Sequence, residues 1–316
     1  MKVLALNIIE KTKGEYNKNF IDPFHKKPIY DKINSRWVEH FQIKHNIVAR
    51  SQTGKLLCSP EKMFETETQV ALHLGQMKRM FDRAELDEGL IENIDETHFV
   101  VNMDNGRTLG FRGDDDVKYA DVVSGGESMT MIVRITGGPS SHVEAPMIIF
   151  QNQNRSYPIH GVPDNVPGVC YRSGPKGWID RQLFPEWFLE HRAYQPDPYG
   201  RTKTIFLDNC GGHNITPELE SALQKINTKL LFLPPCSTDL CQPADSFVIS
   251  KIKDAWTRRW DEKKMEMISE QQWSNASKTG KTGSGKLRNP GKSFFLKLAA
   301  DAVRDVNLQR DENGLT

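Results

Sequence analysis

The stretch that decides the fold is "KTIFLDNCGGHN", Lys203–Asn214. Residues Thr204–Leu207 have the apolar character of a central strand, and Asp208 follows where that strand must end. Gly211–Gly212 indicates a sharp turn, and a helix begins near Thr216. Asp208 is therefore expected at the carboxyl end of a strand, where open α/β sheets bind their ligands. The alternative is a structural role in which Asp208 bonds the amides of the turn.

Around this stretch the chain alternates between strand-like and helix-like segments. Apolar strand-like segments come first, and alternating helices and strands follow them. This order predicts an α/β fold, with a mixed sheet and helices on its faces. The predicted strands are 90–102, 107–113, 129–137, 145–152, 203–209 and 229–235, and the predicted helices are 60–83, 178–191, 216–226, 243–264 and 293–310.

Charge is balanced over the whole chain but not along it. The 316 residues carry 42 Lys and Arg against 41 Asp and Glu, a formal net charge of +1. This balance gives no global signature of a nucleic-acid binder, so a DNA-binding surface must be local. Two basic segments fit DNA contact, although solvated helix faces carry similar charges. Their basic residues are Arg36, Lys44 and Arg50 in the first and Lys251, Lys253, Arg258 and Arg259 in the second.

Two further aspartates have surroundings that suggest chemistry. Asp95 interrupts an apolar strand, where an acid must be paired, hydrogen-bonded or metal-bound, because burying a bare carboxylate is costly. An edge-strand carboxylate facing water is the alternative. Asp245, in "QPAD", lies in the first turn of helix 243–264, where an acid also stabilises the helix dipole whatever its function. Asp239, in "STDL", is the rival acid in this region.

Three aspartates at one end of a sheet would repel one another without cations. Carboxylate oxygens suit Mg²⁺ or Mn²⁺, and a pair of such ions promotes phosphodiester cleavage. The residues Asp95, Asp208 and Asp245 therefore predict metal-dependent phosphodiester chemistry. The alternative is a metal site with sulfur and nitrogen ligands, because two pairs of residues loosely resemble a structural zinc site. These are Cys210 with His213 and Cys236 with Cys241.

Four motifs carry a family resemblance. They are "NIDETHF" (Asn93–Phe99), "VKYADVVSGGESMTMIVRITGG" (Val117–Gly138), "IFLDNCGGH" (Ile205–His213) and "LFLPPCSTDLCQPADSFVI" (Leu231–Ile249). In this order they resemble the acidic-triad (DDE) transposases and endonucleases, specifically the pogo branch of the mariner superfamily, which includes Jerky and centromere protein B. The cysteines of the last motif stand where the family more often has Asn, Thr or Ile, which weakens the zinc alternative.

The resemblance implies a ribonuclease H-like fold with a catalytic and metal-binding triad of Asp95, Asp208 and Asp245. "QPAD" matches the element that carries the third acid, which favours Asp245 over Asp239. Asn209 and His213 are expected beside the metal ligands. The resemblance further implies two Mg²⁺ or Mn²⁺ ions, DNA (transposon ends and target DNA) as the substrate, no membrane partner, and the nucleus as the location. A homodimer is one assembly open to such a protein.

The expected organisation has four parts. They are a truncated helix-turn-helix remnant over 1–58, a helical linker over 59–90, a catalytic domain over 91–265, and a flexible linker with a C-terminal helix over 266–316. The expected function is that of a DNA transposase or endonuclease that cuts phosphodiester bonds and transfers strands. The alternative is a domesticated, non-catalytic nuclear DNA-binding protein.

Overall fold

The computed structural model describes residues 19–45, 59–101, 128–270 and 286–309, with the single residues 5, 9, 17, 123 and 272. The chain divides into two compact units, Met1–Cys58 and Ser59–Thr316, and each is described by itself. The predicted strand 107–113 and the basic residue Arg50 lie outside the described residues. Among the described helices, none is long and apolar enough to cross a membrane.

Residues 19–45 of the first unit form the short helices α2 (Ile29–Lys32) and α3 (Ser35–Lys44). α3 begins where the Asn34 side chain accepts a hydrogen bond from the Trp37 amide at 3.0 Å, which satisfies one of the free N–H groups of the first turn. Trp37 and Phe41 stack on this helix with ring centroids 5.2 Å apart. The helix expected in this basic segment is thus present.

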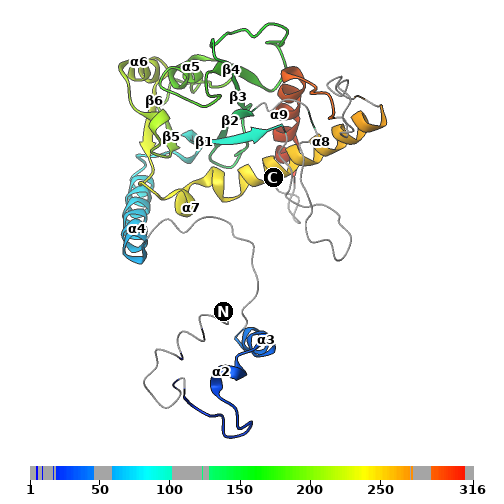
Figure 1. Ribbon diagram of the computed structural model, residues 1–316. Helices are drawn as coiled ribbons and strands as arrows, with labels where there is room; N and C mark the ends of the chain where they lie inside the picture. The colour runs from blue at the N-terminus through cyan, green and yellow to red at the C-terminus, as the bar shows by residue number, and fades with distance from the viewer. Residues whose placement is uncertain are drawn as a thin grey trace. The chain divides into compact units, whose positions relative to one another are not determined.

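The second unit is built around a six-stranded sheet in the order β4-β3-β2-β1-β5-β6 (Figure 1). β2 runs antiparallel to β1 and β3, whereas β5 is parallel to β1 and β6, and β4 is parallel to β3. This arrangement confirms the predicted ribonuclease H-like mixed sheet. The strands are β1 (Ile91–Val100), β2 (Ser128–Thr136), β3 (Met147–Gln151), β4 (Cys170–Gly174), β5 (Lys203–Leu207) and β6 (Thr228–Phe232).

Helices cover both faces of the sheet, as predicted (Figure 1). Buried apolar side chains of α8 and α9 pack on one face, and those of α5 and α6 pack on the other. These faces are called the α8 face and the α5 face below. The four helices are α5 (Leu183–Leu189), α6 (Pro217–Lys225), α8 (Ile249–Ser269) and α9 (Lys292–Asn307).

Side chains of β1 alternate between the two faces, as in any strand. Phe99 belongs to the core on the α8 face, where it stacks on Trp256 with ring centroids 4.1 Å apart. Ile94 belongs to the core on the α5 face. The alternation therefore directs Asp95 toward the α8 face and Glu96 toward the α5 face.

Two predicted helices differ from the structure in extent. α5 begins only at Leu183, because the Asp180 carboxylate accepts hydrogen bonds from the amides of Gln182 and Leu183 at 3.0 and 3.1 Å and so caps the helix there. The predicted helix 243–264 consists of a π-helical turn, η3 (Ala244–Val248), followed by α8. Such π-helical turns are frequent at functional sites, and this one carries Asp245.

Helix α4 (Pro60–Asp82) begins as predicted, with Ser59 as its cap and proline in the first turn. The sequence predicts that its apolar stripe serves core or interdomain packing. Within the second unit this stripe is buried only in part, since Val70 and Met77 are buried but Phe64 is 72% exposed. In Figure 1, α4 extends away from the edge of the sheet near β5.

Replacing Phe99 by Ala should lower the free energy of unfolding by about 3–5 kcal/mol, because the change removes a fully buried ring and leaves a cavity beside Trp256. Phe64→Ala is the matched control and should change it by less than about 0.5 kcal/mol. Urea unfolding of both variants checks this. Equal losses would show that α4 packs as the sequence suggested.

Candidate functional site

The three predicted aspartates lie on three elements that meet at one end of the central strands. Asp95 is in β1, Asp208 directly follows β5, and Asp245 is in η3, which contacts β1. β1 and β5 are parallel neighbours in the sheet, so their carboxyl ends share an edge. The rival acid, Asp239, lies on the surface in the short helix α7 (Thr238–Cys241).

Asp95 is the buried member of this group, with 7% of its surface exposed. Burial raises the pKa of its carboxyl to about 7, and the carboxylates of Asp245, Glu96 and Asp208 add to this rise. A hydrogen bond from the Glu96 amide to Asp95 Oδ1, 2.9 Å long, acts in the opposite direction. The site thus concentrates negative charge around a buried carboxyl, which is the electrostatic setting of a cation site.

A single buried side chain, Asn93, ties the three elements together. Its Nδ2 donates to the Phe206 carbonyl of β5 at 2.9 Å and to Gln242 Oε1 at 2.8 Å. Its Oδ1 accepts from the Ala244 amide of η3 at 3.0 Å. Gln242 in turn donates to the Ile94 carbonyl at 3.3 Å. These bonds fix the positions from which Asp95, Asp208 and Asp245 project, and we call them the Asn93 clamp.

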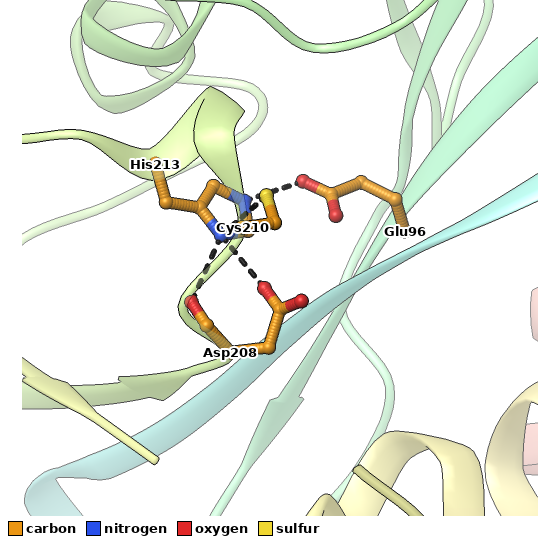
Figure 2. A group of neighbouring side chains, drawn as sticks. All are labelled: Glu96, Asp208, Cys210 and His213. Atoms are coloured by element: carbon orange, nitrogen blue, oxygen red, sulfur yellow. Dashed lines mark hydrogen bonds and ion pairs between the residues drawn. The ribbon is translucent and has the colours of Figure 1, made fainter. Parts of the chain in front are cut away.

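A second set of contacts surrounds Asp208 on the α5 face (Figure 2). The fully buried His213 lies between two carboxylates, with Nε2 2.6 Å from Glu96 Oε1 and Nδ1 2.8 Å from Asp208 Oδ1. Cys210 Sγ is 3.2 Å from the same Nδ1 atom. The ligand atoms of these four side chains all lie within 4.8 Å of one another, a grouping able to hold a metal ion.

In this second set, the positive charge of His213 balances negative charge of the neighbouring carboxylates. Burial opposes the charge of the His213 ring, but hydrogen bonds with Asp208, Cys210 and Glu96 outweigh burial and raise the pKa of His213 to about 12. The contact with His213 also lowers the pKa of Asp208. Asp208 Oδ1 is nevertheless buried without a donor aligned for a full hydrogen bond among the described residues. This oxygen therefore has capacity for another partner.

The predicted zinc site of Cys210, His213, Cys236 and Cys241 is not formed. Cys210 and His213 face Glu96 of β1, whereas the Cys241 thiol donates to Ser237 Oγ at 3.2 Å and Cys236 is exposed. The turn expected at Gly211–Gly212 is present as a single 3-10 turn, η2 (Gly211–His213), in which neither glycine has a positive φ. Gly212 is required because a Cβ there would lie 3.1 Å from the Ile179 carbonyl oxygen.

The predicted basic residues fall into three groups. Arg36 and Lys44 are exposed on α3. Arg258 and Arg259 both bind the Asp305 carboxylate of α9, with shortest distances of 2.7 and 2.6 Å, so the structure gives them a role in helix packing rather than a free basic surface. Lys251 and Lys253 come earlier on α8. Burial lowers the pKa of His98 on β1, and the charge of Lys253 adds to this effect.

Several residues near the site were not predicted from the sequence. They include Asn93, Gln242 and Glu96, each of which belongs to a motif that was chosen for its aspartate. Another is Trp178, which is 61% exposed and lies between two surface hollows of about 560 and 430 Å³. The larger hollow is lined partly by Arg155, Lys176 and Arg181, and the smaller one partly by Glu96, His98 and Cys210.

A family model described as DDE superfamily endonuclease matches residues 137–310, more than half of the chain. The chain belongs to this family. The matched region includes Asp208 and Asp245, while Asp95 lies ahead of it on β1.

Comparisons with individual proteins found a curated relative and several solved structures. The chain is 24% identical over 216 residues to the Jerky protein of Mus musculus, a match that takes in 66% of this chain and 36% of that protein's length. A Mos1 transposase paired-end complex with left transposon end is similar at a TM-score of 0.47 and 12% identity, over 88% of this chain and 69% of the other. A Mos1 mariner paired-end complex with Mn gives 0.47 and 12%, over 89% and 70%.

Replacing Asn93 by Ala should lower the free energy of unfolding by about 3 kcal/mol or more, because three groups lose their partner and each costs about 1–3 kcal/mol. The amide of Ala244 should also exchange faster with solvent, which hydrogen-exchange mass spectrometry of the η3 segment measures. Asn214→Ala, at an exposed position, is the control. Unchanged exchange in η3 would contradict the clamp.

The raised pKa of Asp95 predicts a pH-dependent loss of stability in chelator-treated protein. Between its unfolded pKa of 3.8 and about 7, the folded state keeps a proton that the unfolded state has lost. The stabilisation is thus complete below pH 4 and lost as the pH rises through 7, on the order of 3 kcal/mol. Urea unfolding at pH 5 and pH 8 should show this difference in the wild type.

Asp95→Asn should remove that part of the pH dependence and keep the contribution of His213, which is common to both proteins. The comparison therefore isolates one carboxyl. Identical pH profiles for the two proteins would show that the Asp95 pKa is not raised by the fold.

Proposed function

We propose that this chain cuts DNA phosphodiester bonds and joins the freed strand to target DNA, using divalent cations held by Asp95, Asp208 and Asp245. Membership of the DDE endonuclease family supports the reaction class. The observation that carries the assignment to these residues is the buried Asp95 carboxyl, whose pKa is raised by burial and by the carboxylates of Asp245 and Asp208. Such a group is stabilised in its ionised form once a cation joins the three acids.

The donor set fits Mg²⁺ or Mn²⁺. Asp95 and Asp245 offer carboxylate oxygens on the α8 face, and Asp208 has a buried oxygen with unused hydrogen-bonding capacity. When bound, two such ions would neutralise the acids, activate the attacking oxygen and stabilise the leaving one. The part played by the chain is positional, since the Asn93 clamp sets the separation of the acids before any ion arrives.

The surface beside the acids has features that suit a DNA strand. Lys176 and Arg181 are exposed around the larger hollow, and Trp178 presents an exposed ring on which a base can stack. Lys253 lies on α8, and its charge acts on His98 of β1. Cationic side chains at these places would bind phosphates. The proposal includes two ions and action in the nucleus, as the sequence resemblance implied, and a homodimer is one assembly open to it.

The direct test is DNA nicking with the purified full chain. Addition of Mg²⁺ or Mn²⁺ should produce cut strands, and Asp208→Asn should reduce the rate at least 100-fold, because a neutral amide binds hard cations far less well than a carboxylate. Asp239→Asn, a change at the exposed rival acid, is the matched control and should keep the wild-type rate.

Nicking that survives Asp208→Asn in a folded protein would refute the assignment. DNA binding without nicking in the wild type, under either metal, would favour the alternative of a non-catalytic DNA-binding protein. Circular dichroism of each variant establishes that the fold is intact.

A further inference from the structure

A second metal site is suggested by the turn that follows β5. Three ligand atoms of different chemistry converge there, Asp208 Oδ1, Cys210 Sγ and His213 Nδ1 (Figure 2). Nδ1 lies 2.8 Å from Oδ1 and 3.2 Å from Sγ. Ligand atoms that share a tetrahedral zinc ion lie about 3.5 Å apart, given bonds of about 2.0–2.3 Å. The three atoms therefore need only small outward shifts to surround an ion.

We propose that Asp208, Cys210 and His213 form a site for a thiolate-binding divalent cation such as Zn²⁺, with Glu96 orienting the histidine. Imidazole, thiolate and carboxylate together favour Zn²⁺ over Mg²⁺, which prefers an all-oxygen shell. The site differs from the sulfur-rich one that the sequence suggested, because Asp208 is a ligand and Glu96 an orienting group, whereas Cys236 and Cys241 take no part.

Glu96 has the position of an orienting group rather than a ligand. Its Oε1 lies 2.6 Å from His213 Nε2, on the opposite side of the ring from Cys210 and Asp208. Metal-bound histidines usually donate their second ring N–H to such a carboxylate, which fixes the ring and makes the other nitrogen the ligand. Phe184 packs against the same ring with centroids 4.7 Å apart, so the imidazole is held before an ion binds.

Access and proton balance are consistent with metal binding. The hollow of about 430 Å³ is lined by Glu96, Cys210 and Gly211 and opens beside the site, which gives an ion and a fourth, water ligand a route. On binding, the Cys210 thiol and the protonated Nδ1 of His213 each give one proton to solvent. One metal–sulfur and one metal–nitrogen bond replace those two bonds to hydrogen.

Occupation of this site would control the nuclease site through the shared Asp208. The turn site lies on the α5 face with Glu96, whereas Asp95 and Asp245 lie on the α8 face. A Zn²⁺ ion would hold the Asp208 carboxylate on the α5 face and withdraw it from the other two acids. Zn²⁺ should therefore inhibit Mg²⁺-dependent cleavage. This inhibition rests on the proposed function, but the binding of the ion does not.

The test is a Co²⁺ titration of the chelator-treated full chain, followed by absorption spectroscopy. The wild type should develop a thiolate-to-cobalt charge-transfer band with tetrahedral visible bands, and Zn²⁺ should abolish both. Cys210→Ser should lose the charge-transfer band, and Glu96→Gln should bind Co²⁺ about 10- to 100-fold more weakly. Cys241→Ser, which changes a thiol outside the site, should keep the wild-type spectrum.

A wild-type titration without a charge-transfer band would overturn the proposal. So would a band that persists in Cys210→Ser or disappears in Cys241→Ser, since another thiol would then hold the ion. In the nicking assay, Cys210→Ser should resist a Zn²⁺ concentration that inhibits the wild type at least 10-fold, and equal inhibition would refute the shared-Asp208 mechanism. If no variant cuts DNA, the proposed nuclease function fails, and the cobalt spectrum still decides the metal site.

Discussion

The hydrogen bonds of the Asn93 side chain are the contacts on which the geometry of the acids depends. Asn93 uses both of its amide protons and its oxygen, and all its partners belong to other parts of the chain. An aliphatic side chain of the same size would leave those buried groups unpaired, and an aspartate would lack the donors. The carboxyl end of the central strands is therefore held by hydrogen bonds at a place where apolar packing alone would cost less desolvation free energy. That arrangement suits a site whose acids must keep fixed positions.

Holding these acids close together is electrostatically unfavourable for the folded protein. Asp95 is buried among carboxylates that raise its pKa, while Asp208 is partly neutralised by the cationic His213 on the other face. The two sides of β1 thus deal with negative charge in different ways. Around Asp95 the negative charge is left for a bound cation to balance. On the α5 face, His213 balances the negative charge within the protein. Asp208 lies between them, which makes its carboxylate the point through which the two sides interact.

The sequence predicted the architecture well where periodicity and turn residues were strong. The apolar strands, the capped helix α4 and the position of Asp208 at a strand end follow from local pattern. Packing was harder to predict, because Phe64 has a helical spacing typical of a core residue but lies on a helix that projects from the sheet. Partners distant in sequence were hardest. Asn93 and Ala244 are separated by 151 positions, and no local pattern links them.

The same limit explains the basic residues and the metal ligands. From the sequence, Arg258 and Arg259 were predicted to belong to a DNA-binding basic segment. In the structure, both pair with Asp305 of α9. From the sequence, Cys210 and His213 were interpreted as half of a cysteine-rich zinc site. In the structure, Glu96 of β1 contacts the histidine instead. In both cases the partner that sets the role of these residues came from another element of the fold. Family resemblance supplied the choice of Asp245 over Asp239, which residue pattern alone left open.

The central claim is that Asp95, Asp208 and Asp245 together hold the catalytic cations. Anomalous diffraction from a crystal grown with Mn²⁺ tests it most directly, because the ion is located without reference to activity. We expect anomalous density within coordination distance of Asp95 and Asp208, with Asp245 as a further ligand, and its loss in Asp95→Asn. Ordered Mn²⁺ elsewhere on the chain, with none at Asp95, would contradict the account.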